Sequence, residues 1–154
     1  MIQYHFPTVI FYGSDAIKDL PLAIKEKNIK RLLLVTDPGL IEIGLSKKVL
    51  QFFKESGLQI EVFDGVHPNP IEEDITTGVT TFQSGNFDAL IALGGGSAMD
   101  VAKAIRFMAV HKPPLSQYDE ALGGDQKIIH PLPPMYAIPT TAGTGSEVGR
   151  SSVI

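Results

Sequence analysis

The chain has 154 residues, which suits one domain with a sizeable core, and it is 44% hydrophobic and 19% charged, with a mean hydropathy of +0.12. This composition predicts a compact folded protein, and the net charge of −4 provides no positive surface for nucleic acid or an anionic membrane. The absence of cysteine excludes disulfides, zinc–thiolate sites and thiol catalysis. Because the sequence shows neither a signal-peptide pattern nor an apolar run of the roughly 18 residues that a membrane helix needs, we expect a cytoplasmic protein.

The first third of the chain begins with a run rich in β-branched and aromatic residues. Residues 6–12 (FPTVIFY) have this composition and predict a strand. Ser14 is a candidate helix N-cap, and Pro21 at a first-turn position predicts a second short helix through Lys27. Residues 32–36 (LLLVT) form a continuous apolar run that is too short for a helix, which predicts a strand buried on both faces.

The same alternation continues through the middle of the chain. Apolar residues recur at helical spacing over residues 45–53 and predict a helix that ends near Gly57. Residues 59–63 (QIEVF) predict the next strand, and apolar residues at positions 71, 75, 79 and 82 mark one face of another helix. Residues 89–93 (ALIAL) predict a second buried strand.

The last third of the chain predicts a helix, a long connection and a short strand. The helix is expected from about Ala98 to Val110 and ends before the proline pair at 113–114. The side chains expected to face the sheet from this helix are Val101, Ala102, Ile105 and Met108. Residues 112–134 form the connection that leads to the strand at 136–138. This alternation implies one α/β domain over the whole chain, a doubly wound, mostly parallel, Rossmann-like sheet with helices on both faces.

Ligands of such sheets bind at the carboxyl ends of the strands, where the first candidate loop is Gly94–Asp100 (GGGSAMD). Its glycines allow a ligand close to the backbone, and the helix that follows directs its free N–H groups and positive dipole end there. An anion at such a point gains about 0.3–1 kcal/mol, and the natural occupant is a pyrophosphate. The alternative is a tight turn in which Ser97 and Asp100 form a capping box. An ordinary dinucleotide fingerprint or Walker loop is disfavoured, because Met99 replaces the third glycine and no Gly-Lys-Ser/Thr follows.

Two further loops follow predicted strands. Residues 139–147 (PTTAGTGSE) contain four hydroxyl side chains and two glycines, which suit a ribose, a carboxamide or a phosphate oxygen. The alternative is a solvated turn in which Thr144 and Glu147 form a capping pair. Asp37 could accept both ribose hydroxyls of an adenosine and would repel a 2′-phosphate. It could equally cap the turn at residues 38–39.

Together these stretches resemble the iron-containing (group III) alcohol dehydrogenase family, whose fold is similar to that of dehydroquinate synthase and glycerol dehydrogenase. The stretches that carry the resemblance are FPTVIFYGSDAI, LLLVTD, DGVHPNP, DALIALGGGSAMDVAKAI and AIPTTAGTGSEV. They extend over essentially the whole chain, and GGGSxxDxAKAI followed by PTTAGTGSE is a highly specific pair. The resemblance implies a dinucleotide-binding domain of the dehydroquinate synthase type over residues 1–154.

The resemblance also implies which residues bind NAD(H). Those that would hold the pyrophosphate are Gly95, Gly96 and Ser97. Asp37 would bind the adenosine ribose and favour NAD over NADP, and Asn69 and Pro70 would border the adenine. Those that would line the ribose and nicotinamide end are Asp100, Thr140, Thr141 and Thr144. At the position of Gly149 the family often has a threonine or serine, so a side-chain contact is lost there, and Ser151 would still contribute.

In the family a second, all-helical domain follows and carries an aspartate and three histidines that bind Fe²⁺. The present chain stops at Ile154, so we expect that domain and its iron ligands to be absent. The histidines of the chain form no HxxxH or HExxH pair, and we assign a metal role to none of them; they are His5, His67, His111 and His130. Without the metal as a Lewis acid on the alcohol oxygen, we expect this fragment not to turn over.

The leading hypothesis is the NAD(H)-binding domain of an iron-dependent alcohol dehydrogenase, which transfers hydride between a small alcohol or aldehyde and the nicotinamide. A second hypothesis is a non-catalytic module that forms homodimers. A missing domain would leave an apolar surface exposed, and in the family the N-terminal strand, here residues 4–11, crosses to a partner subunit. A third is a domain of a dehydroquinate synthase-like or glycerol dehydrogenase-like enzyme or a related lyase, which no lysine–histidine cluster supports. Neither nucleic acid nor a membrane is an expected partner.

Overall fold

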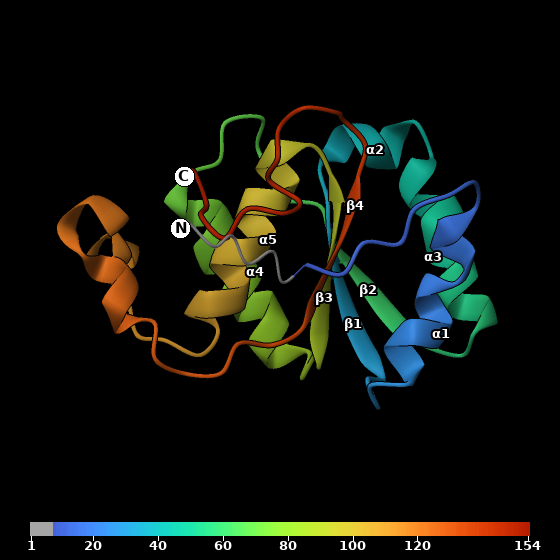
Figure 1. Ribbon diagram of the computed structural model, residues 1–154, viewed down its shortest axis with the longest axis horizontal. Coiled ribbons are helices and arrows are strands. Elements are labelled where there is room, and N and C mark those ends of the chain that lie inside the picture. The colour runs from blue at the N-terminus through green and yellow to red at the C-terminus, as the bar shows by residue number, and fades with distance from the viewer. Residues whose placement is uncertain (1–7) are drawn as a thin grey trace, which may run out of the picture.

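The computed structural model describes residues 8–154, and a four-stranded parallel sheet forms its centre (Figure 1). Its strands are β1 (Arg31–Val35), β2 (Gln59–Phe63), β3 (Ala89–Gly94) and β4 (Met135–Pro139). The strands lie in the order β2-β1-β3-β4, and each neighbouring pair is parallel. This confirms the predicted doubly wound α/β fold.

Helices cover both faces of the sheet, with α4 and α5 on one face and α1 and α3 on the other (Figure 1). The α-helices are α1 (Leu20–Lys25), α2 (Pro38–Glu42), α3 (Leu45–Glu55), α4 (Glu72–Ser84) and α5 (Gly96–Met108). The 3-10 helices are η1 (Ala16–Lys18), η2 (Leu115–Tyr118), η3 (Glu120–Leu122) and η4 (Gly124–Lys127). The last three belong to the connection 112–134, which projects away from the sheet (Figure 1). Over residues 8–154 no helix has the length and apolar character needed to cross a bilayer.

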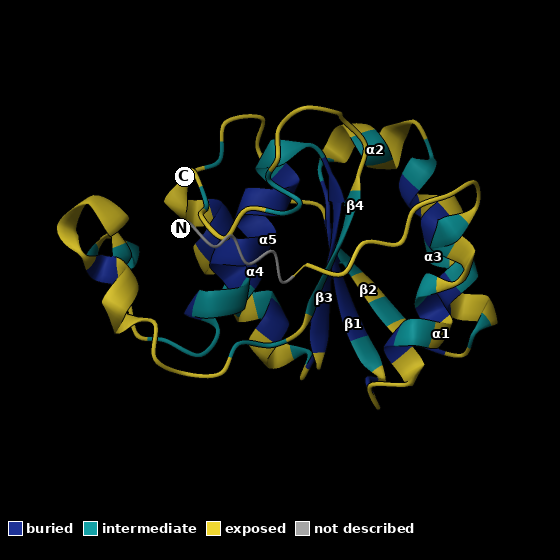
Figure 2. Cartoon of the chain, viewed as in Figure 1, coloured by how far each residue is buried: buried dark blue, intermediate teal, exposed yellow. Residues whose placement is uncertain are grey.

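The core follows from the alternation of side chains along β1. Leu33 and Val35 pack with the apolar side chains of α4 and α5, whereas Leu32 and Leu34 pack with those of α1 and α3. All four are fully buried, because β1 is a central strand with helices on both sides (Figure 2). Along the edge strand β2, residues 59–62 alternate between exposed and half-buried, and Phe63 at the end of the strand is buried.

Two predictions near the N-terminus are wrong. Residues 8–12 form no strand, and residues 6 and 7 lie outside the described part of the chain. The apolar side chains of Val9, Ile10 and Phe11 are exposed, and a β-prone run becomes a strand only where a neighbouring strand pairs with it. The N-cap of η1 is Asp15 rather than Ser14.

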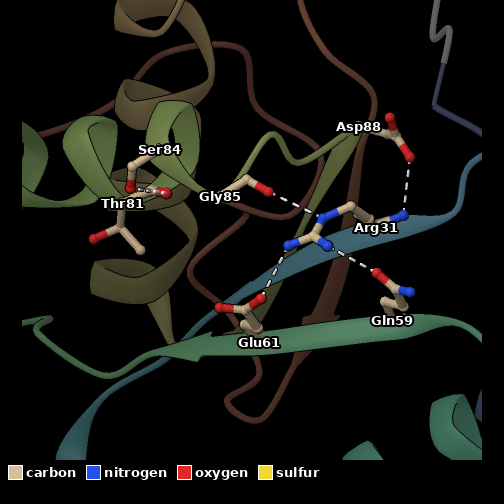
Figure 3. A network of polar contacts seen from close by, with 7 residues as sticks. All are labelled: Arg31, Gln59, Glu61, Thr81, Ser84, Gly85 and Asp88. Carbon is tan, nitrogen blue, oxygen red and sulfur yellow. Dashed lines mark hydrogen bonds and ion pairs between the residues drawn. The ribbon is translucent and has the colours of Figure 1, made fainter.

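Arg31, at the amino end of β1, forms hydrogen bonds with residues of neighbouring segments (Figure 3). Its guanidinium donates to the carbonyl of Gly85 at 3.0 Å, to Gln59 Oε1 at 2.8 Å and to Glu61 Oε1 at 3.1 Å. The backbone N–H of Arg31 donates to Asp88 Oδ2 at 2.9 Å. These contacts join β1, β2 and the turn before β3 at the amino ends of the strands. Ligands of such sheets bind at the other end, beyond the carboxyl ends of the strands.

Candidate cofactor-binding site

The order of the strands creates a switch point between β1 and β3. The chain passes outward from β1 to β2, returns to β3 beside β1, and then continues outward to β4. Ligands of open parallel sheets bind beyond the carboxyl ends of the strands at such a point. Asp37 follows β1 there, and residues 94–96 join β3 to α5. The topology therefore brings two of the three predicted loops to one crevice.

The helix α5 begins without a side-chain cap. Gly95 is its N-cap residue, with φ −85° and ψ −161°, and no side chain among residues 8–154 accepts a hydrogen bond from the first turn. Ser97 and Asp100 lie inside the helix, so the capping box considered above is wrong. A Cβ atom on Gly94 would lie 2.7 Å from the Cβ of Ala98, so only glycine allows β3 to turn this sharply into the helix. The open amides and the helix dipole at this point favour an anion.

The loop after β4 packs directly over these glycines. The N–H of Thr140 donates to the carbonyl of Gly94 at 2.9 Å, which continues the ladder between β3 and β4. A Cβ on Gly95 would lie 3.1 Å from Thr141 Oγ1, and one on Gly96 would lie 3.5 Å from Cγ2 of Thr144. The loop after β4 thus packs closely against the glycines, and its hydroxyl-bearing residues lie beside the start of α5.

The same loop forms turns rather than a capped helix. Thr144 Oγ1 donates to Glu147 Oε2 at 3.4 Å and accepts from the N–H of Ser146 at 3.3 Å, rather than forming the side-chain-to-backbone bonds of a capping pair. No helix begins at this pair in the described chain. Most side chains of residues 140–147 are exposed, so their hydroxyls are open to a ligand.

Asp37 caps a helix that the sequence analysis considered only as a turn. Its Oδ1 accepts from the N–H of Leu40 at 3.0 Å, and Pro38 occupies the first turn of α2. The other oxygen, Oδ2, lies 3.4 Å from the position that a Cβ of Gly94 would occupy. Asp37 can cap α2 and bind a ligand at the same time, because the cap uses Oδ1 whereas Oδ2 faces Gly94.

The loop after β2 also reaches the start of α5. Ser97 donates its hydroxyl hydrogen to the carbonyl oxygen of Pro68 at 2.7 Å. The next residues, Asn69 and Pro70, are exposed and half-buried respectively. The predicted adenine-side residues therefore lie in a loop that is bonded to the predicted phosphate site.

A buried ion pair on α5 was not predicted from the sequence. Asp100 Oδ1 and Lys103 Nζ are 2.8 Å apart, and their side chains are 11% and 9% exposed. Asp100 Oδ2 accepts from the N–H of Val153 at 3.2 Å, and Lys103 donates to the carbonyl of Ser151. The pair anchors the end of the chain to α5, and the i,i+3 spacing of opposite charges on this helix was the available signal. Contact of Asp100 with a ribose remains a prediction.

The remaining predicted residues line a broad groove of about 1900 Å³ along α5, β4 and the chain end. Gly149 and Ser151 are in its wall, as are Tyr136 of β4 and Arg106 of α5. Burial raises the pKa of the Tyr136 phenol and lowers the pKa of the Arg106 guanidinium. Arg106 donates through Nε to the carbonyl of Pro133 at 2.5 Å.

The described residues do not fit an iron site. Over residues 8–154 no three histidine, cysteine or acidic side chains come together as metal ligands. His67 Nδ1 is 2.6 Å from Asp74 Oδ1, and His111 accepts through Nε2 from the N–H groups of Ile129 and His130. These histidines have structural partners in different parts of the fold.

A parallel sheet with a glycine loop and an uncapped helix at its switch point defines a Rossmann-like α/β domain. The model of the family described as iron-containing alcohol dehydrogenase matches residues 7–154. The chain therefore belongs to the iron-containing alcohol dehydrogenase family.

Individual relatives show the same similarity. The chain is 40% identical over 151 residues to a choline dehydrogenase of Bacillus subtilis (strain 168), with 98% of this chain and 37% of the relative covered. It is 38% identical over 156 residues to a 1,3-propanediol dehydrogenase of Klebsiella pneumoniae, with 100% and 39% covered. The crystal structure of a 1,3-propanediol oxidoreductase superposes with a TM-score of 0.86 at 37% identity, covering 97% of this chain and 38% of that one. The chain thus spans about two fifths of the length of these relatives.

Proposed function

We propose that this chain is the NAD(H)-binding part of a cytoplasmic, iron-dependent alcohol dehydrogenase. The observation that carries the proposal is the start of α5 at the switch point, which has no side-chain cap and lies beside the hydroxyl-bearing loop that packs against Gly95 and Gly96. The uncapped amides at the start of α5 bind the pyrophosphate there, and the Ser97 hydroxyl lies beside it. A dinucleotide fits this arrangement because its phosphates are at its centre and its two nucleosides extend to opposite sides.

The order of the strands supports one orientation of the dinucleotide. The adenosine lies toward β1 and β2, where Asp37 binds the ribose hydroxyls and disfavours a 2′-phosphate, and where Asn69 and Pro70 border the adenine. The nicotinamide end lies toward β4, on the opposite side of the crevice. The residues proposed to line that end are Asp100, Thr140, Thr141, Thr144, Gly149 and Ser151.

When bound, the nicotinamide accepts or donates the hydride. The residues of this chain orient the cofactor and stabilise the negative charge of its pyrophosphate. The substrate is a small alcohol or aldehyde, a class that several relatives carry in their names. Residues 8–154 bring together no cluster of metal ligands, and we propose that these residues bind the cofactor without by themselves turning over substrate.

Titration of the purified chain with NADH, followed by the fluorescence of the nicotinamide, tests the proposal. We expect a saturable change. Gly95→Val should abolish it, because even a Cβ at this position would lie 3.1 Å from Thr141 Oγ1, so the larger side chain displaces the loop after β4 and covers the amides of α5. The backbone of Gly95, at φ −85°, accommodates a β-branched residue without strain, so the variant should remain folded by circular dichroism. The absence of a saturable fluorescence change up to millimolar NADH would contradict the proposal.

We also propose that the chain forms homodimers through residues 4–11. Residues 4–7 lie outside the described part, and the exposed apolar side chains of Val9, Ile10 and Phe11 support the proposal. Sedimentation of the chain with and without residues 1–12 tests it. A chain that is monomeric in both forms contradicts it.

A further inference from the structure

A buried carboxylate, Asp74, binds the loop between β2 and α4 at two of its backbone N–H groups. Asp74, in the first turn of α4, accepts from the N–H of His67 at 3.1 Å and from the N–H of Ile71 at 3.3 Å. Its other oxygen, Oδ1, lies 2.6 Å from Nδ1 of His67. The Asp74 side chain is 2% exposed and that of His67 is 61% exposed, so a solvated imidazole covers a buried anion.

Besides these hydrogen bonds the loop is anchored by Val66, which is buried in the core beside Phe63. Residues 64–71 form no helix or strand, and Pro68 and Pro70 have no N–H to donate. Asp74 binds the backbone on both sides of this proline pair, and Ser97 binds the carbonyl of Pro68 between them. Asn69 therefore sits between fixed points that are anchored to α4 and α5.

We propose that Asp74, with His67, is a positioning residue that holds Asn69 and Pro70 where they meet the adenosine end of the dinucleotide. The inference rests on the proposed function, because it needs an adenosine on the β2 side of the switch point. Asp74 does not touch the cofactor. It acts through the loop, since loss of its hydrogen bonds frees the backbone on either side of Asn69.

The effect is specific to the adenosine half, and two probes separate it from a general loss of structure. NADH contains the adenosine, whereas reduced nicotinamide mononucleotide lacks it and carries the same fluorophore. Asp74→Asn keeps the size of the side chain and removes the charge and one acceptor. We expect the Kd for NADH to rise about tenfold, the scale of one hydrogen bond to a charged group, and the Kd for the mononucleotide to stay unchanged.

Matched variants complete the experiment. Glu73→Gln removes a negative charge from the same helical turn, and Glu73 is exposed and makes no side-chain hydrogen bond in the described chain, so NADH binding should not change. His67→Ala removes one of the three contacts of Asp74 and should raise the Kd for NADH about threefold, since a hydrogen bond contributes about 0.5–1.5 kcal/mol net. Because the His67 side chain is largely exposed, His67→Ala should fold, and its Kd for NADH tests the inference if Asp74→Asn does not fold.

The result that overturns the inference is an unchanged Kd for NADH in the folded variants, or equal losses for NADH and the mononucleotide. Amide hydrogen exchange without nucleotide tests the anchoring by itself. Exchange at His67 and Ile71 should accelerate in Asp74→Asn relative to Glu73→Gln, and equal rates contradict the anchoring. If the unaltered chain fails to bind NADH, the proposed function fails, while the exchange rates still decide whether Asp74 orders the loop.

Discussion

Ser97 donates its hydroxyl hydrogen to the carbonyl oxygen of Pro68 across 2.7 Å, which joins the first turn of α5 to the loop after β2. The hydroxyl that the resemblance assigned to a phosphate thus gives its one hydrogen to the link between two loops of the site, and the backbone N–H of Ser97 is what remains for an anion. The amides of the same turn carry no side-chain cap and remain for the anion.

Removing this hydroxyl should affect binding more than stability. We expect Ser97→Ala to weaken NADH binding about threefold to tenfold, because one net hydrogen bond of about 0.5–1.5 kcal/mol holds the β2 loop against α5. Ser84→Ala is the control, since Ser84 donates to the carbonyl of Thr81 at the end of α4, away from the switch point. Equal Kd values for NADH in Ser97→Ala and the unaltered chain would argue against the link between the loops.

The two roles of Asp37 can be separated by two substitutions. Asp37→Ser retains a cap for the N–H of Leu40 but loses the carboxylate, whereas Asp37→Ala loses both. We expect the alanine variant to lose about 1 kcal/mol of unfolding free energy and the serine variant less. Both should bind NADPH more tightly, relative to NADH, than the unaltered chain does, because a negative charge no longer faces the 2′-phosphate. An unchanged NADPH-to-NADH ratio of Kd values in both variants would remove Asp37 from the ribose site.

Gly78 sets the spacing between the two helices on one face of the sheet. A Cβ at this position would overlap Cδ1 of Ile105 and lie 3.4 Å from Cε1 of Phe63. Overpacking costs about 1–3 kcal/mol, and alanine offsets about 1 kcal/mol of this through its better helix propensity. We expect Gly78→Ala to lower the unfolding free energy in urea by about 1 kcal/mol, from the balance of these terms.

A double-mutant cycle with Ile105→Val checks the cause. Valine removes Cδ1, so the cost of Gly78→Ala should be at least about 0.5 kcal/mol smaller in that background. Additive effects would show that the destabilisation arises elsewhere.

The raised pKa of Tyr136 predicts a loss of stability at alkaline pH. Burial favours the neutral phenol in the folded chain, so the unfolded chain releases this proton at a lower pH than the folded chain does. The contribution is fully present below the ordinary pKa of about 10 and is lost as the pH rises through the folded value. We expect the unfolding free energy of Tyr136→Phe to fall less than that of the unaltered chain between about pH 9 and pH 11.

Tyr12→Phe provides the matched control, because Tyr12 is 98% exposed. Its stability should follow that of the unaltered chain over the same pH interval. If the curve of Tyr136→Phe runs parallel to both, burial of the phenol does not contribute to the alkaline loss.

Most strands and helices could be predicted because their signals are local. The bounds of β2 agree residue for residue with the predicted strand 59–63, where turn residues flank an alternating run. The prediction over residues 6–12 is wrong across its described part, because strand formation depends on a partner that composition does not reveal. The helix α5 begins two residues earlier than expected, since its N-cap is the backbone of Gly95 and leaves no side-chain signal.

The features of the candidate site also divide into those that could be predicted from the sequence and those that could not. That residues 94–96, Asp37 and the loop after β4 lie together followed from the rule that parallel strands end at one edge of the sheet. The contacts of Ser97 with Pro68 and of Asp74 with His67 depend on how loops from different strands fold against α5 and α4. No periodicity in the sequence encodes these distances.

A crystal structure of the chain with NAD⁺ bound tests the central claim most directly. We predict the pyrophosphate within hydrogen-bonding distance of the backbone N–H groups of residues 95–97, with the adenosine toward β2 and the nicotinamide toward β4. A dinucleotide bound elsewhere, or N–H groups of residues 95–97 covered by side chains of the protein, would contradict the account.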